Sequence, residues 1–342
     1  MRILHAPLDV GGHAAGLAAA ERELGYESDV AVFTPGPFGY QSTIDLRAGR
    51  DVALPVRFAR RADFLRRALK EYDVFHFNFG QTLLQVRAMG RVIDELALIK
   101  RAGKTVVVTY QGCDARPFEA CHCQSLRCAK ESPYRTIAAS RVHEHADLIY
   151  HLNPDLAKWL PRSSFVPYAS VDPLEMLPNA KDRVGKRASG ETVVLHAPTN
   201  RAVKGTEHVV RAINELTEEG LAVHLNLVEG AQRSDVAGEI RKSDIVVDQL
   251  MVGWYGSFAV EAMALEAPVL CFIDDENNPF GDALPIVRAE PTNLKEQIRT
   301  LALDPKLRAK QGNAGRKFVE DTHDPRKVAA RILSDIEQHR SQ

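Results

Sequence analysis

The segment from Gly253 to Cys271 has the residue pattern with the clearest chemical meaning in this sequence. A glycine turn precedes a helix expected to begin near Ser257, a good N-cap residue, and then a buried strand from Pro268 to Ile273. Free backbone N–H groups near Gly256 and Ser257, together with the helix dipole, favour binding of a phosphate group. Glu261, one turn further on, is placed to accept two hydroxyl hydrogen bonds, as from a ribose. The alternative is an ordinary helix–strand unit with Glu261 in solvent.

Two cations, Arg201 and Lys204, follow a predicted strand and precede a predicted helix. Arginine can grip two phosphate oxygens and lysine supplies a point charge, so the pair suits a diphosphate. The alternative is a solvated helix start, because an Arg-x-x-Lys pattern is very common.

Two adjacent glycines, Gly11 and Gly12, follow the first predicted strand. Glycine permits close approach of the backbone to a ligand, and His13 could then face that ligand. An ordinary strand–helix turn is the alternative. His5 and His196 also lie near predicted strand ends, and both a buried and a site histidine fit their positions.

Four of the five cysteines lie close together, at Cys113, Cys121, Cys123 and Cys128, with His122 among them. Four thiolates suit a tetrahedral zinc ion, and a site closed by four protein ligands would be structural. The spacing departs from the usual paired Cys-x2-Cys pattern, so four ordinary thiols and an iron–sulfur cluster remain as alternatives. The clustering is unlike a disulfide framework.

Composition favours an ordinary globular protein of two domains. The chain has 342 residues, of which 45% are hydrophobic and 26% charged, and its net charge of −1 gives no drive toward nucleic acid. No apolar run reaches the roughly 20 residues that span a bilayer. Met1–His5 leads straight into a strand-like run without the apolar core of a signal peptide, so we expect a cytoplasmic location.

The segment 57–70 carries six cations together with the apolar residues Phe58, Leu65 and Leu69. Such a basic amphipathic helix could lie on an anionic membrane and bring the protein to a lipid-linked substrate. The alternative is a surface helix that packs these three side chains on its own sheet. A peripheral position on the inner membrane surface is therefore an open expectation.

The chain alternates short β-branched runs with helical patterns, which predicts mainly parallel, doubly wound sheets. In the first half the predicted strands are Arg2–His5, Asp29–Phe33, Val74–Phe77, Thr105–Tyr110, Leu148–Leu152 and Phe165–Pro167, and the predicted helices are Ala14–Leu24, Ala88–Ala102 and Tyr134–His145. The pattern restarts after the weakly periodic stretch Asp172–Gly190. It continues with strands at Thr192–Ala197, Val223–Val228, Asp244–Val247 and Val269–Ile273 and helices at Thr206–Glu219, Ser234–Lys242, Ser257–Leu265 and Asn293–Leu303. We expect two similar-sized α/β domains with a hinge near Tyr168–Asp172.

Six of these segments, in this order, resemble the motifs of glycosyltransferase family 4, whose members are retaining enzymes with the GT-B fold. The segments are Asp9–His13, Thr109–Arg116, Ala146–Leu156, Phe165–Asp172, His196–Thr206 and the stretch around Glu261. The resemblance covers nearly the whole chain. It implies two Rossmann-like domains facing a central cleft: residues 1–170 for the acceptor, 171–324 for the nucleotide sugar, and a last helix in 325–342 that crosses back to the first domain.

The resemblance also implies an activity. The chain is expected to move a sugar from a nucleotide-diphosphate sugar to a glycan, lipid-linked or small-molecule acceptor, without a cofactor for the chemistry. Gly12, Gly256, Ser257 and Glu261 would bind the donor, Arg201, Lys204 and Gln111 would act in catalysis, and His13 and Asp114 would lie on the acceptor side.

Two positions depart from the family pattern. Gln111 stands where many members have a histidine, and glutamine can donate a hydrogen bond but cannot take a proton. Gly253 stands where the first of two paired glutamates is expected, although Asp248 lies just upstream. These departures keep two alternatives open: a catalytically weak sugar-nucleotide-binding subunit of a glycan-assembly complex, and a sugar-nucleotide 2-epimerase.

Overall fold

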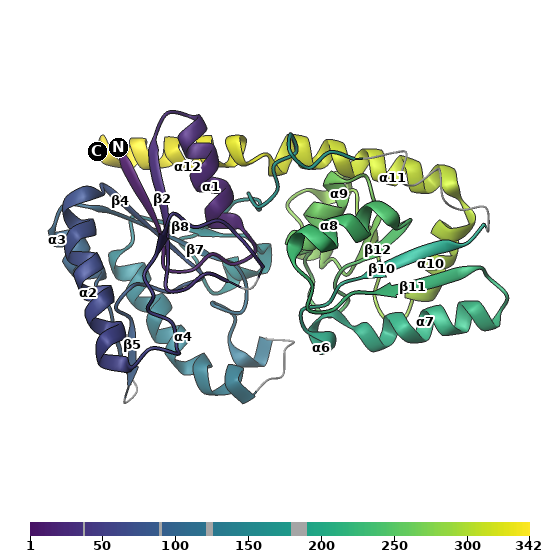
Figure 1. The fold of residues 1–342 in the computed structure, drawn as a ribbon, viewed down its shortest axis with the longest axis horizontal. Helices are drawn as coiled ribbons and strands as arrows, with labels where there is room; N and C mark the ends of the chain where they lie inside the picture. The colour runs from purple at the N-terminus through teal and green to yellow at the C-terminus, as the bar shows by residue number, and fades with distance from the viewer. Residues whose placement is uncertain (37, 89–90, 121–125, 179–189) are drawn as a thin grey trace. The chain divides into compact units, whose positions relative to one another are not determined.

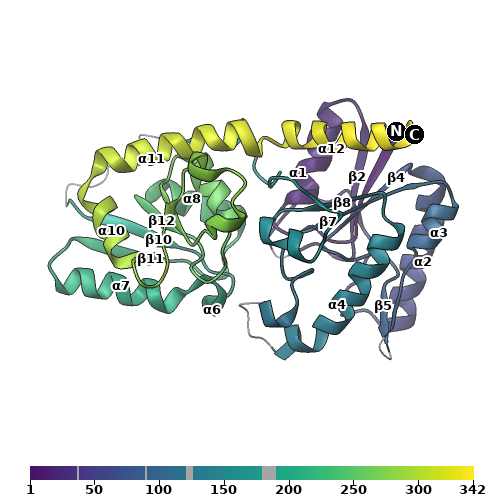
Figure 2. The same ribbon diagram turned by 180° about the vertical axis from the view of Figure 1, so that it is seen from behind.

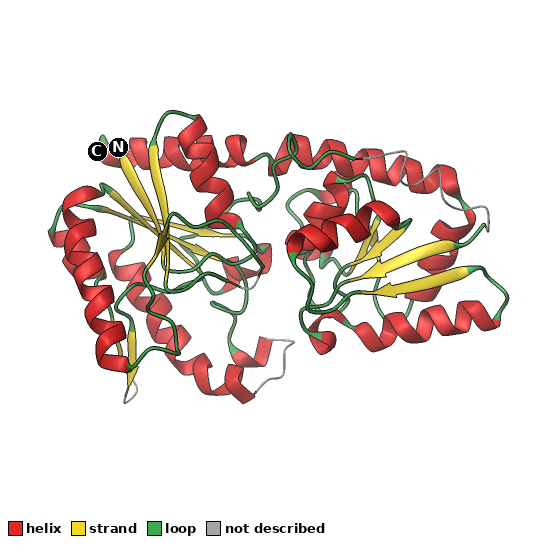
Figure 3. Cartoon of the chain, viewed as in Figure 1, coloured by secondary structure: helices red, strands yellow, loops and turns green. Residues whose placement is uncertain are grey.

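The computed structural model describes residues 1–36, 38–88, 91–120, 126–178 and 190–342. The chain forms two compact units, one made of Met1–Ser170 with Pro325–Gln342 and the other of Val171–Asp324. Each unit is a parallel β-sheet with helices packed on its faces (Figures 1, 2 and 3).

The sheet of the first unit has the strand order β3-β2-β1-β4-β7-β8-β9, and every neighbouring pair is parallel. The strands are β1 (Arg2–Ala6), β2 (Glu27–Val32), β3 (Ile44–Asp45), β4 (Val74–Asn78), β7 (Thr105–Tyr110), β8 (Leu148–His151) and β9 (Ser164–Phe165). Every residue of β4 and β7 is buried, as expected for a parallel sheet covered on both faces. Helices α2 (Leu54–Glu71), α3 (Leu96–Arg101) and α4 (Leu126–His145) build one core, while α1 (His13–Glu23) covers the other face.

The sheet of the second unit has the order β11-β10-β12-β13-β14, again with parallel neighbours. Its strands are β10 (Thr192–His196), β11 (Val223–Leu227), β12 (Ile245–Val247), β13 (Val269–Cys271) and β14 (Val287–Arg288). Its helices are α6 (Arg201–Lys204), α7 (Thr206–Glu218), α8 (Arg233–Lys242), α9 (Ser257–Ala264), α10 (Leu294–Leu303) and α11 (Pro305–Phe318). The chain starts this sheet at β10, places β11 on one side of it and then continues with β12 on the other side. Ligands of such sheets bind at the carboxyl ends of the strands, where the order switches.

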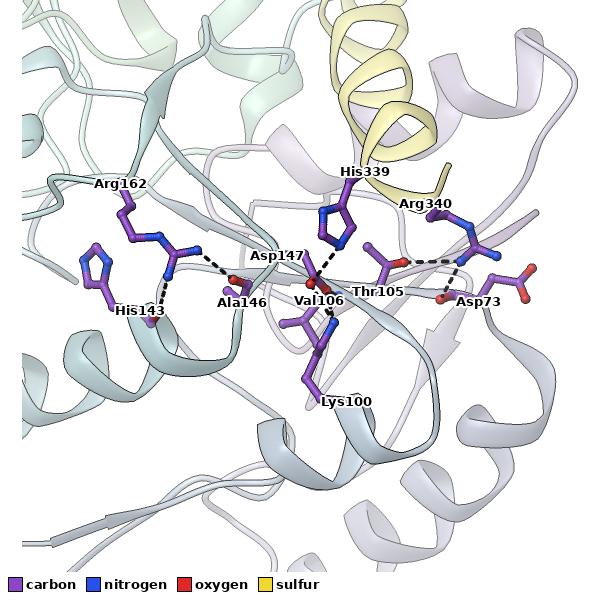
Figure 4. A network of polar contacts seen from close by, with 10 residues as sticks. All are labelled: Asp73, Lys100, Thr105, Val106, His143, Ala146, Asp147, Arg162, His339 and Arg340. Atoms are coloured by element: carbon purple, nitrogen blue, oxygen red, sulfur yellow. Dashed lines mark hydrogen bonds and ion pairs between the residues drawn. The ribbon is translucent and has the colours of Figure 1, made fainter. Parts of the chain in front are cut away.

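Helix α12 (Pro325–Arg340) follows the second unit in sequence but packs on α1 of the first unit. Its end is tied down by a polar network centred on Asp147 (Figure 4). Asp147 Oδ1 lies 2.9 Å from His339 Nε2 and 2.5 Å from Lys100 Nζ, and Oδ2 accepts the N–H of Val106 at 2.8 Å. The same carboxylate therefore holds α3, the start of β7 and the end of α12.

The helix predicted over Ala88–Ala102 is wrong in its first half. Strands β5 (Val86–Ala88) and β6 (Arg91–Ile93) form an antiparallel hairpin there, and α3 begins only at Leu96. The buried Glu95 carboxylate explains the break, because it accepts the N–H groups of Leu83 and Leu84 at 2.6 and 3.0 Å. A side chain that binds a neighbouring loop in this way fixes the chain outside a helix.

The prediction made no helix at α11, although Asp304 caps it by accepting the N–H groups of Lys306 and Leu307, both at 2.9 Å. Asp followed by Pro at the first helical position is a recognised helix start signal, which the prediction overlooked.

Helix α2 packs one part of its apolar residues on the core and leaves the others exposed to solvent. Leu65 is buried and Leu69 packs on the core, as the packing alternative predicted. Phe58 and Leu54, however, are 45% and 66% exposed at the start of the helix. Within the part of the chain that the structure describes, no helix is both long enough and apolar enough to cross a membrane.

Candidate functional site

A completely buried carboxylate, Asp248, organises the carboxyl edge of the second sheet. It follows β12 directly, and its Oδ1 lies 2.5 Å from Lys204 Nζ at the end of α6. Its Oδ2 accepts the N–H of Gly256 at 2.8 Å. A Cβ atom placed on Gly256 would lie 3.6 Å from Lys204 Nζ, so the ammonium group sits beside the start of α9.

The first turn of α9 differs in one position from the prediction. Gly256, not Ser257, is the N-cap residue, and Ser257 begins the helix without a side-chain cap. The reason is that Asp248 binds the Gly256 N–H and so holds that residue in extended backbone. Ala259 and Val260 donate to Gly256 O, and the N–H groups of Ser257 and Phe258 have no acceptor among the described residues. These two groups and Lys204 are therefore the candidate anion-binding part of the site.

Glu261 is buried, which contradicts the alternative that placed it in solvent. Its Oε1 lies 2.5 Å from Nε of Arg233, the first residue of α8. Burial raises the pKa of Glu261, and the attraction of the Arg233 guanidinium opposes that rise. Arg233 was not among the predicted site residues; its signal was a cation at the start of the helix after β11.

Arg201 lies on the surface of the same unit, with 44% of its side chain exposed. Its guanidinium pairs with Glu207 at 2.8 Å and with Glu229 at 3.0 Å, and the hydrogen bond to Glu207 raises the pKa of Arg201. Surface pairs of this kind contribute little to stability, and binding of a ligand by Arg201 stays a prediction.

His196 is a buried histidine that supports the folded structure of the second unit. It is fully buried, and its Nδ1 donates to Val247 O while Nε2 accepts from the Thr206 hydroxyl, each at 2.9 Å. Burial lowers the pKa of His196 and keeps the ring neutral. The histidine thus joins β10, β12 and α7 beneath the site.

Gly253 stands where the related pattern has its first glutamate, and the structure gives a steric reason for the glycine. A Cβ atom at Gly253 would lie 2.7 Å from Asp274 Cβ, closer than real Cβ contacts come. Asp274 fills that space and accepts from Asn277 Nδ2 at 2.5 Å. A glutamate at position 253 therefore requires Asp274 to move.

In the first unit, the loop after β7 is built around Asp114. Its carboxylate accepts the N–H of Gln111 at 3.0 and 3.1 Å and the N–H of Gly112 at 2.6 Å. Burial raises the pKa of Asp114 to about 6, although these N–H donors favour the charged form. Gln111 is itself buried, and its Nε2 has no acceptor among the described residues. The predicted site residues Gln111 and Asp114 are therefore brought together, and a hydrogen bond from the Gln111 amide to a ligand stays a prediction.

We expect Asp114 to make the stability of the first unit depend on pH. Because its folded pKa lies above the usual value of 3.8, the folded chain holds a proton between about pH 4 and pH 6 that the unfolded chain has lost. Its contribution to stability is thus largest below about pH 4 and falls by about 3 kcal/mol up to pH 6. Urea unfolding of wild type and Asp114→Asn, followed by Trp159 fluorescence in a Trp254→Phe background, measures the difference. A difference that does not change with pH contradicts the raised pKa.

Gly12 and His13 have clear structural reasons for their identity. Gly12 has φ +76°, and a Cβ atom there would lie 2.7 Å from the Tyr40 ring. His13 is completely buried, and its Nδ1 accepts the N–H of Ala169 at 3.1 Å. His5 is a core histidine paired with Glu21 at 2.9 Å. The structure thus gives His13 a contact within its own unit, and its contact with an acceptor stays a prediction.

The predicted metal site lies partly outside the described residues, because Cys121 and Cys123 are not among them. Cys128 is buried, and Arg135 donates to its Sγ at 3.0 Å. Zinc binding stays a prediction: purified protein should carry about one zinc per chain, and a chelator should make the thiols reactive. Metal analysis with no stoichiometric zinc or iron, and four freely reactive thiols, would leave ordinary cysteines.

Solved structures that are similar to this chain include an alpha-glucosyltransferase and several sugar or starch synthases. Sucrose-phosphate synthase from Thermosynechococcus elongatus superposes with a TM-score of 0.70 at 17% identity over 99% of each chain. The catalytic domain of starch synthase IV from Arabidopsis thaliana, solved with ADP and acarbose, gives 0.62 at 11% identity over 100% of each chain. A trehalose-6-phosphate synthase, from a study of glycosyltransfer with retention, gives a TM-score of 0.62 at 11% identity over 98% of each chain.

These likenesses confirm the predicted fold class, the GT-B fold of two Rossmann-like domains. No protein-family model matches the sequence, and no curated protein matches it. Sequence identities of this size establish the fold, and the function must be argued from the site.

Proposed function

We propose that this protein is a retaining glycosyltransferase of the family 4 type, which takes a sugar from a nucleotide-diphosphate sugar. The observation that carries the proposal is the position of the Lys204 ammonium beside the first turn of α9, whose Ser257 and Phe258 N–H groups have no acceptor among the described residues. A cation and a helix N-terminus together suit a diphosphate. Solved structures of the same fold include complexes with UDP and with ADP.

In this proposal the second unit binds the donor. Lys204 and the first turn of α9 hold the diphosphate and stabilise its charge as the glycosidic bond to it breaks, without a metal ion. Arg201 leaves its surface carboxylates to reach the same group, and Glu261 accepts hydroxyl hydrogen bonds from the ribose. Gly12 gives a further close backbone approach to the donor. The leaving phosphate serves as the base, so Gln111 needs only to donate a hydrogen bond.

The first unit, with Gln111, Asp114 and His13, binds the acceptor in this proposal. A glycan, a lipid-linked sugar and a small molecule all remain in the acceptor class. The test is release of a nucleoside diphosphate when the purified chain meets a nucleotide sugar and an acceptor from a broad panel. Slow hydrolysis of the donor without acceptor is also expected, because water can replace the acceptor.

The start of α2 is our proposed contact with an anionic membrane that carries a lipid-linked acceptor. Leu54 and Phe58 share one helix face and are exposed, and six cations follow along the helix. The wild-type chain should sediment with vesicles containing phosphatidylserine, and Leu54→Ser/Phe58→Ser should reduce this clearly. Replacing Leu98, an exposed leucine of α3, is the control. Equal sedimentation of both variants, or none of the wild type, removes the membrane contact.

A second candidate function is a sugar-nucleotide-binding subunit without strong activity. It is favoured by the steric exclusion of a carboxylate at Gly253. Tight binding of a nucleotide sugar with no diphosphate release across the acceptor panel would select it over the enzyme.

A further inference from the structure

Asp248 holds, in the free chain, the Lys204 ammonium group that would meet the donor's diphosphate. One oxygen binds the Lys204 ammonium at 2.5 Å and the other binds the first N–H at the start of α9 at 2.8 Å. We propose that Asp248 competes with the donor for Lys204 and thereby sets how tightly the site holds a nucleotide diphosphate. This inference rests on the proposed function and adds to it a residue that sets the affinity for the diphosphate.

The described cations at this edge of the sheet each have a carboxylate partner from the chain itself. Lys204 pairs with Asp248, Arg233 with Glu261, and Arg201 with both Glu207 and Glu229. Three cations therefore face four carboxylates, and a diphosphate meets no surplus of positive charge. Binding must proceed by exchange of one anion for another, which weakens affinity and speeds release of the product.

Among these carboxylates, burial singles out Asp248. The side chains of Glu207 and Glu229 are 75% and 45% exposed, so solvent screens their attraction to Arg201. The side chain of Asp248 is 0% exposed and that of Lys204 is 12% exposed, so the attraction between them acts at a lower effective dielectric constant. Asp248 also accepts the Gly256 N–H, which restrains its side chain beside Lys204.

The test is Asp248→Asn, which keeps the size of the side chain and an oxygen for the Gly256 N–H. The change leaves the nearly buried Lys204 ammonium without a counter-charge, which destabilises the free chain. An incoming diphosphate supplies that charge. Dissociation constants for inorganic pyrophosphate, UDP and ADP should therefore fall roughly tenfold. The melting temperature should be lower than wild type without ligand, and the rise on adding ligand should be larger.

Two matched variants separate competition from general damage. Asp244→Asn removes a carboxylate that accepts the Val193 N–H near the other end of the strands, at 2.8 Å, and should leave ligand affinity unchanged. In Lys204→Met/Asp248→Asn the tenfold gain should vanish, because the freed cation is gone. If Asp248→Asn does not fold, Asp248→Ser offers a hydroxyl acceptor to Gly256 and should also bind pyrophosphate more tightly than wild type.

The outcomes distinguish this inference from the proposed function. If Lys204→Ala loses pyrophosphate binding but Asp248→Asn binds it no more tightly than wild type, Asp248 only braces the site and the competition is refuted. If none of the chains binds pyrophosphate, UDP or ADP, the phosphate site itself is refuted, and the inference fails with it.

Discussion

Replacing Lys204 by alanine is expected to weaken binding of a nucleotide sugar by roughly ten- to hundredfold, because one charge-assisted contact to phosphate is lost. The turnover rate should fall as well, since the same cation stabilises the leaving diphosphate. Calorimetry with UDP and ADP, followed by assays with the best nucleotide sugar, measures both effects. The structure adds a condition: Asp248 is left buried without its partner, so the variant should be less stable and must be assayed well below its melting temperature.

Lys242→Ala is the matched control for this variant. Lys242 lies at the end of α8 in the same unit, and its 63%-exposed side chain pairs with Glu239 at 2.7 Å. Its loss should change neither affinity nor turnover. Binding and turnover that stay at the wild-type level in both Arg201→Ala and Lys204→Ala would remove the phosphate role from this site.

The largest effect on stability is expected from Gly16→Ala in α1. A Cβ atom at Gly16 would lie 1.7 Å from the backbone oxygen of Ala169. Helix α1 and the backbone around Ala169 therefore cannot both keep their positions. Overpacking of this kind costs about 1–3 kcal/mol and more where backbone must move. Urea unfolding followed by Trp159 fluorescence in a Trp254→Phe background should show the loss in the first unit.

A second glycine-to-alanine change serves as its control. Gly238 lies in α8, and a Cβ atom there meets nothing within 4 Å. Gly238→Ala should stabilise the helix by about 0.5–1 kcal/mol, because alanine loses less conformational entropy than glycine. A Gly16→Ala protein as stable as wild type would show that α1 can shift without cost.

Strand positions were predictable because the pattern of buried residues is strongest there. β7 has the predicted bounds, and β1, β4, β8 and β10 differ from prediction by a residue at one end. The failures were at α11, whose local Asp-Pro start signal was overlooked, and at the hairpin of β5 and β6, where long-range contacts decide the structure. Glu95 is an example, because its partners Leu83 and Leu84 lie 12 and 11 residues away.

The candidate site was predictable as residue types but not as pairs. The pattern pointed to Lys204, Gly256 and Glu261, and the structure places all three in one unit. It could not show that Asp248 joins the first two, because that contact spans 44 residues, nor that Arg233 pairs with Glu261 across 28 residues. Ion pairs between separate βα segments depend on the folded sheet and leave no local signal.

Helix α12 gives this protein an unusual order of assembly during synthesis. The first unit leaves the ribosome first, yet the helix that covers α1 is made only after the whole second unit. We therefore expect the nascent first unit to stay incomplete, with apolar surface of α1 open to chaperones, while the second unit folds independently. Asp73 links the two ends of the chain, because its Oδ2 accepts the Arg2 N–H and its backbone oxygen accepts from Arg340. The second of these bonds can form only after α12 has been made. Protease treatment of ribosome-bound chains stalled before Pro325 should cut the first unit and spare the second; equal resistance of both would contradict this order.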